Sequence, residues 1–133
     1  MTPVQRVLAT ARSENGYLEK ATNAQLEDKT ANAGYNNWNK FAAFLDDLEV
    51  VYNGKKNGYA WCDCFVDYCF IYTFGLELGM AMTFQPKKGA GAGCTYSMGY
   101  WRVKIDQAQE RIFGPDYLHW QERYSYWDER DTY

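Results

Sequence analysis

The sequence predicts a mostly helical domain, and three observations support this fold class. Residues 3–13, 37–48 and 62–75 place apolar side chains at the three- and four-residue spacing of a helix. The first segment begins with Thr2 and Pro3 and the last ends at Gly75, residue types typical of helix starts and stops. With 133 residues, 47% of them hydrophobic, the chain is long enough for one domain with its own core.

The first helix is expected over residues 3–13. Thr2 can cap it, and Pro3 fits the first helical position because the N–H that proline lacks would have no partner there. Its apolar residues are Val4, Val7, Leu8 and Ala11. Residues 14–36 are polar without a sustained period, which predicts an ordered surface segment or a long loop.

The second helix is expected to begin after Asn37, whose side chain can cap its first turn. One face is apolar and the other acidic, so the apolar face should pack inward. The two faces are formed by Phe41, Phe44, Leu45 and Leu48, and by Asp46, Asp47 and Glu49. Two Asn-Gly pairs, at 53–54 and 57–58, then predict tight turns.

The third helix is expected to start at Cys62 and to be central, because apolar residues occur on most of its sides. One face is formed by Cys62, Phe65, Val66, Cys69, Phe70 and Thr73. Asp63 and Asp67 lie four residues apart, and we expect a solvated or capping role for both. Gly75 ends this helix, and residues 76–84 predict a short helix before Pro86.

Residues 89–93 form a glycine-rich run, Gly-Ala-Gly-Ala-Gly. A phosphate-binding loop of the common type ends in Gly-Lys-Ser or Gly-Lys-Thr and follows a strand, and neither feature is present. We therefore interpret the run as a flexible or close-packed loop.

Charge and hydropathy exclude several partners. The formal net charge of −3 argues against nucleic acids and other polyanions, which normally require a basic patch. No stretch approaches the ~20 apolar residues of a membrane span, and no lysine-flanked apolar signal segment opens the chain. We expect no membrane insertion and a protein that is cytoplasmic when made.

The four cysteines are Cys62, Cys64, Cys69 and Cys94. Their spacing differs from that of zinc-binding pairs, and a disulfide framework requires an oxidising compartment. We expect Cys64, Cys69 and Cys94 to be reduced, mostly buried thiols. No Asp-x-Asp cluster precedes Cys62, so we expect neither calcium nor another metal or cofactor.

Cys62 is the candidate nucleophile. It follows a turn containing Gly58 and opens a strongly apolar helix. The unpaired N–H groups and the positive end of the helix dipole favour a thiolate at such a position, and the thiolate is the reactive form.

The surroundings of Cys62 also resemble a known family. Tyr59–Asp63 and Phe65–Asp67 are similar to the nucleophile motif of CHAP (cysteine, histidine-dependent amidohydrolase/peptidase) domains, especially those of phage and prophage endolysins from Gram-positive hosts. Other segments that resemble this group are Glu14–Lys20, Asp28–Gly34, Tyr52–Gly58 and Gly91–Ser97. The resemblance covers most of residues 3–100.

The resemblance implies an α+β, papain-like fold, with a histidine on an antiparallel strand as general base. The only histidine is His119, whose neighbours differ from the family's Gly-His-Thr-Gly-like setting. Residues 1–105 are expected to form the helical half, with a helix at about 95–105 near the substrate cleft. We expect the family's domain to be truncated before the strand that carries the catalytic histidine, so that most of the sheet is missing. Residues 106–133 are then expected to form a divergent, aromatic-rich tail.

The tail itself supports two interpretations. Its aromatic residues recur at alternating steps of four and three, which predicts a helix, whereas the family expects strands there. The stripe consists of Phe113, Tyr117, Trp120, Tyr124 and Trp127.

By resemblance, the Cys62 thiolate attacks a peptidoglycan amide and forms an acyl-enzyme that water resolves. His119 is the only candidate base, although a packing or surface role for it stays open. The backbone N–H of Cys62 is the expected oxyanion donor, with Tyr59 as a second. The expected substrate contacts are Tyr59, Trp61 and Tyr96. A lytic protein of this kind acts at the cell wall, which it reaches through another protein's membrane lesion.

Two other classes of function stay open. The chain is alternatively a non-catalytic module whose Trp and Tyr side chains hold wall glycopeptide. It is otherwise a defective fragment, whose exposed apolar helices would drive self-association.

Overall fold

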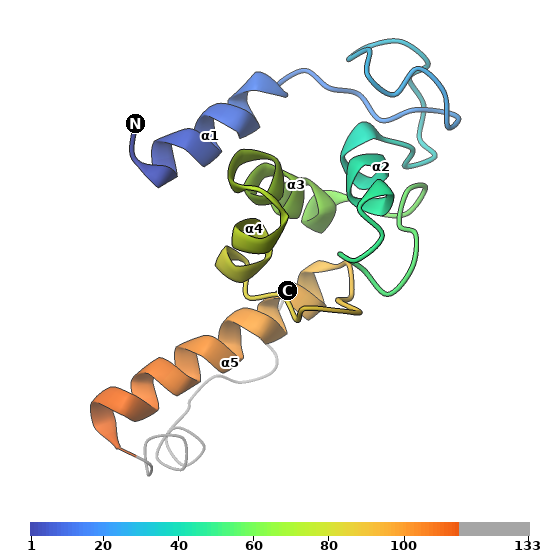
Figure 1. The fold of residues 1–133 in the computed structure, drawn as a ribbon. Coiled ribbons are helices and arrows are strands. Elements are labelled where there is room, and N and C mark those ends of the chain that lie inside the picture. Colours follow the sequence, from blue (N-terminus) through green and yellow to red (C-terminus); the bar gives the residue numbers. More distant parts are fainter. Residues whose placement is uncertain (115–133) are drawn as a thin grey trace, which may run out of the picture. The chain divides into compact units, whose positions relative to one another are not determined.

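The structure is a computed structural model that describes residues 1–114. These residues form five helices: α1 (Pro3–Ser13), α2 (Lys40–Asp47), α3 (Cys62–Phe74), α4 (Leu76–Met82) and α5 (Cys94–Phe113) (Figure 1). The mostly helical fold predicted from the sequence is confirmed. No strand occurs in this part of the chain, where β pairing is limited to isolated bridges. The papain-like fold stays a prediction, and His119 lies outside the described residues.

The chain divides into two compact units, residues 1–100 and 101–133. The first unit holds α1 to α4 and the start of α5, and its core surrounds α3, which contacts α1, α2 and α4. The second unit contains the rest of α5. The whole of α5 is longer than the helix expected at 95–105. Its exposed apolar side chains within the described residues include Trp101, Val103, Ile105 and Ile112.

The first helix forms as predicted. Thr2 and Gln5 build a reciprocal capping box, in which each side chain accepts a hydrogen bond from the other residue's backbone N–H. The helix has no buried residue and is fixed to the end of α3 through polar contacts. The hydroxyls of Thr10 and Thr73 lie 2.6 Å apart, and the Arg6 guanidinium donates to the Thr73 carbonyl.

The long loop between α1 and α2 is ordered around a buried lysine. Lys20 is fully buried, and its Nζ donates to the Asp28 carbonyl oxygen at 2.5 Å and lies over the Tyr17 ring. The Lys20 backbone N–H donates to the Trp38 carbonyl at 2.7 Å. A loop without regular secondary structure therefore has its own internal anchor, which fixes Tyr17 beside α2.

The cap of α2 differs from the prediction. Asn39, and not Asn37, is the N-cap, and its Oδ1 accepts from the Ala42 N–H at 2.8 Å. Because both residues are asparagine, tertiary contacts determine which of them caps the helix. Asn39 is buried, and its N–H donates to the Asn57 side chain. The predicted apolar face does pack inward, with Phe41 and Leu45 buried.

The buried face of α3 also differs from the prediction. Cys62 and Val66 are exposed, whereas two aspartates expected in solvent or in a cap are buried. The buried residues of α3 are Asp63, Cys64, Asp67, Tyr68, Cys69 and Ile71. The helix is nearly uniform in hydropathy, so its pattern could not indicate which side would be covered.

Gly79 sets the distance between α3 and α4, which are joined at Gly75. Gly75, with φ of 87°, ends α3, and α4 packs back on it through Gly79. A Cβ at Gly79 would lie 2.5 Å from the Ile71 Cα, which is closer than any side chain allows. None of the helices in residues 1–114 has the length and hydropathy needed to cross a membrane.

Candidate active site

Cys62 is the first residue of α3, and its side chain is exposed. Trp61 occupies the N-cap position and makes no side-chain capping hydrogen bond. The first N–H groups of a helix have no intrahelical acceptor, so this helix start offers donors as well as a positive dipole end. The local arrangement predicted for a reactive thiol is therefore present.

Cys94 corrects a prediction, because it is exposed and not buried. It is the first residue of α5, and its Sγ lies 3.5 Å from the Cys62 Sγ. The hydrogen bond with Cys62 and the charge of that neighbour raise the pKa of the Cys94 thiol. The structure thus brings together two cysteines that each open a helix.

The glycine-rich loop holds Cys94 in this place. The Gly93 N–H donates to Asp63 Oδ2 at 2.8 Å, which ties the start of α5 to the first turn of α3. The Gly91 N–H donates to the Tyr100 hydroxyl at 3.0 Å, and a Cβ at Gly91 would lie 2.4 Å from the Tyr96 ring. The sequence left open whether this loop is flexible or close-packed, and the structure favours the close-packed form.

A buried polar cluster lies on the covered side of α3. The Tyr52 hydroxyl donates to Asp67 Oδ2 at 2.6 Å. Burial raises the pKa of the Asp67 carboxyl to about 7 and that of the Cys64 thiol to about 12. Burial also raises the pKa of the Cys69 thiol to about 11. These two cysteines fit the predicted role of buried thiols.

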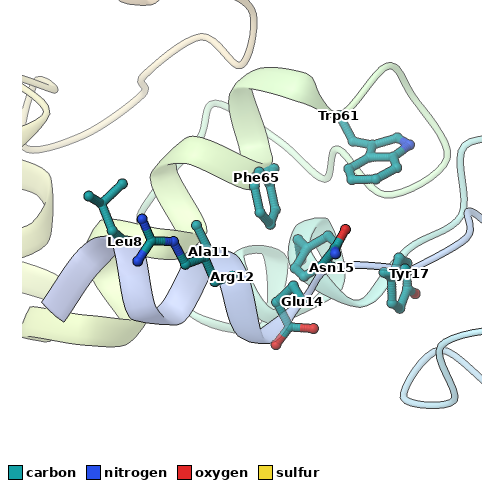
Figure 2. A pocket seen from close by; sticks show the side chains of 10 residues that line it. Leu8, Ala11, Arg12, Glu14, Asn15, Tyr17, Trp61 and Phe65 are labelled. Atoms are coloured by element: carbon teal, nitrogen blue, oxygen red, sulfur yellow. The ribbon is translucent and has the colours of Figure 1, made fainter. Parts of the chain in front are cut away.

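An open aromatic pocket of about 520 Å³ adjoins the start of α3. Leu8, Ala11 and Arg12 of α1 line one side, and Trp61 and Phe65 line the other (Figure 2). The aromatic rings of Tyr17, Phe41 and Trp61 form its floor and pack on one another: the ring centroids of Phe41 and Trp61 are 5.5 Å apart, and the ring planes meet at 26°. At the rim, Glu14 pairs with Lys40 at 2.7 Å.

A second pocket, of about 350 Å³, shares Trp61 and Tyr17 with the first and is also lined by Tyr35. Trp61 therefore lies between two hollows and immediately precedes Cys62. Of the other predicted substrate contacts, Tyr59 is 67% exposed and Tyr96 is 56% exposed. Both are free to meet a ligand from solvent.

The sequence pattern did not predict Cys94 and Asp63 as members of this site. A signal for Cys94 was available, because it follows a glycine-rich run and opens a helix, as Cys62 does. Asp63 gave no signal, because its partner is a backbone N–H thirty residues away in sequence. His119 cannot be placed, since it lies beyond residue 114.

Among residues 1–114, no group of three or more His, Cys, Asp or Glu side chains is arranged to hold a metal ion. No family model, curated protein or solved structure matches this chain.

Proposed function

We propose that this chain is a cysteine peptidoglycan hydrolase of the CHAP type, an amidase or endopeptidase such as phage endolysins contain. The observation that carries the proposal is the exposed thiol of Cys62 at the first position of α3. A thiol in this position is accessible and lies at the positive end of the helix dipole, two conditions that favour a nucleophile.

The reaction is acyl transfer. The Cys62 sulfur attacks the carbonyl carbon of an amide in the cell-wall peptide or at the sugar–peptide junction, and the amine leaves as the acyl-enzyme forms. The backbone N–H of Cys62 is the oxyanion donor, with Tyr59 as a second. Water then hydrolyses the thioester and frees the thiol.

His119 is the proposed base, which takes the thiol proton and later protonates the leaving amine. Asp116 or Glu122 is the residue proposed to orient it. This part of the mechanism depends on the sequence alone.

The aromatic surface beside Cys62 supports a role in substrate binding. Trp61 contributes to two adjoining pockets, and the larger one carries Arg12 and Asn15 next to its apolar floor. Such a surface combines stacking with a few polar contacts, which suits a peptide attached to sugar. The pocket floor of Tyr17, Phe41 and Trp61 is the proposed subsite for the acyl side of the bond.

The test is the release of new amine termini from purified Gram-positive peptidoglycan. Wild type should release them, Cys62→Ala should fall to background, and Cys69→Ala, which removes a buried thiol, should retain activity. His119→Ala tests the base separately. Equal release by wild type and Cys62→Ala would overturn the proposal.

A non-catalytic wall-binding module is the second candidate, favoured by the exposed side chains of Tyr35, Tyr59 and Tyr96. In that case wild type and Cys62→Ala would sediment equally with peptidoglycan and release nothing from it. Substitution of Tyr59 by alanine would then weaken sedimentation.

A further inference from the structure

The two exposed cysteines of the chain form a pair, and the two others are separated from it. Cys62 and Cys94 each open a helix, and their sulfurs are 3.5 Å apart. Cys64 and Cys69 are buried in the core around α3. The fold therefore places the only two exposed thiols of the sequence against each other.

The contact is held by elements that pack independently of the sulfurs. Asp63 accepts the Gly93 N–H, and the Asn53 N–H donates to the Ala90 carbonyl at 2.9 Å, so both ends of the glycine-rich loop are fixed. A disulfide bond requires the sulfurs to approach to about 2.05 Å. A side-chain rotation at two exposed helix starts is a small movement compared with that of a packed core residue.

We propose that Cys62 and Cys94 are an oxidative modification site, at which a small-molecule disulfide such as oxidised glutathione converts the two thiols into an intramolecular disulfide. This goes beyond the proposed hydrolase function and does not depend on it. Its consequence for that function is direct, because the disulfide would occupy the sulfur proposed as the nucleophile.

The reaction proceeds in two exchanges. The Cys62 thiolate attacks one sulfur of oxidised glutathione; a Cys62–glutathione disulfide forms, and one glutathione thiolate leaves. Cys94 then loses its proton to water and attacks the Cys62 sulfur; the Cys62–Cys94 bond forms, and the second glutathione thiolate leaves. Two protein thiols are oxidised, and one glutathione disulfide is reduced to two thiols.

The order of attack follows from the contact between the thiols. The hydrogen bond with Cys62 raises the pKa of the Cys94 thiol, which disfavours the Cys94 thiolate. Cys62 is therefore the attacking thiol and Cys94 the resolving thiol, close enough to react before a second glutathione arrives.

The test uses the full chain incubated with oxidised glutathione, quenched in denaturant with an excess of alkylating agent so that every free thiol reacts, and analysed by intact mass and peptide mapping. Wild type should lose two of its four alkylatable thiols and the mass of two hydrogens, with Cys62 and Cys94 in one cross-linked peptide pair. Dithiothreitol should restore all four.

Three variants separate the roles. Cys94→Ser should accumulate one glutathione on Cys62, because the resolving thiol is gone. Cys62→Ser should react more slowly and form no internal disulfide. Cys69→Ser is the matched control, and it should form the same disulfide as wild type.

Three results would overturn the proposal: wild type that retains a glutathione on each of Cys62 and Cys94, a disulfide that includes Cys64 or Cys69, or no internal disulfide at all. Circular dichroism of each variant checks that the helices are intact. The readout is independent of peptidoglycan cleavage, so a chain that forms the disulfide but releases no amine would refute only the proposed hydrolase. A chain that cleaves peptidoglycan but forms no such disulfide would refute only this inference.

Discussion

The two sides of α3 carry similar side chains in different surroundings. On the open side, Cys62 is exposed and contacts Cys94. On the covered side, Cys64 and Asp67 are buried beneath Tyr52, and burial raises the pKa of both groups. The comparison teaches that solvent access, and not residue type, decides which thiol of this helix can react.

The largest expected effect is on alkylation. Iodoacetamide at neutral pH should modify Cys62 first and Cys94 second, and leave Cys64 and Cys69 unmodified in the folded chain. The shift of the Cys64 pKa from 9.0 to about 12 lowers its thiolate fraction about a thousandfold. Time-resolved peptide mapping measures the four rates. If Cys64 reacts as fast as Cys62, the two sides of α3 do not differ in the reactivity of their thiols.

The next effect is on stability and its pH dependence. Asp67 has its folded-state pKa raised from 3.8 to about 7, so between these values the folded chain binds more protons than the unfolded chain. Its contribution to the free energy of unfolding is therefore complete below pH 3.8 and is lost as the pH rises through about 7. Between these two pKa values, the free energy of unfolding falls by at most about 1.4 kcal/mol per pH unit.

Asp67→Asn should remove this loss while keeping an acceptor for Tyr52. Urea unfolding of both proteins between pH 4 and pH 8 gives the difference, in which the other carboxylates cancel. The variant should gain stability relative to wild type as the pH rises, by an amount on the order of 4 kcal/mol at most. Parallel pH curves for the two proteins would mean that the Asp67 carboxylate is not desolvated.

A substitution at Gly79 should open the covered side. Gly79→Ala introduces a Cβ 2.5 Å from the Ile71 Cα, and separating α4 from α3 costs about 3 kcal/mol. Urea unfolding of this variant and of wild type measures the loss. Gly99→Ala is the matched control, since a Cβ at this position of α5 meets nothing within 4 Å. It should leave stability equal or slightly higher. Equal midpoints of unfolding for both variants would contradict the close packing.

The smallest effect concerns the link between the open and covered sides. Asp63→Ala removes the acceptor of the Gly93 N–H, which should cost about 2 kcal/mol and slow formation of the Cys62–Cys94 disulfide. Asp63→Asn keeps a side-chain oxygen and should restore most of the rate. An unchanged rate in Asp63→Ala would show that the loop is held by its other contacts alone.

The sequence predicted the local structure well where the signals were local. Thr2 and Pro3 set the start of α1, and Gly75 set the end of α3. The prediction was wrong where two equivalent signals competed, as at Asn37 and Asn39, because burial and a contact with Asn57 chose between them. It was also wrong for Asp63 and Asp67, since an aspartate is expected in solvent unless a partner for it is known.

For the candidate site, the sequence determined the position of Cys62 but not that of Cys94. A glycine-containing turn before an apolar helix specifies the position of Cys62 through short-range backbone preferences, which neighbouring residues set by themselves. Only the tertiary structure decided that Cys94 lies against it, because the two residues are 32 positions apart in the chain. The same holds for the covered face of α3: its side chains are apolar nearly all round, so the elements that pack on it, and not its own pattern, determine which cysteines meet solvent.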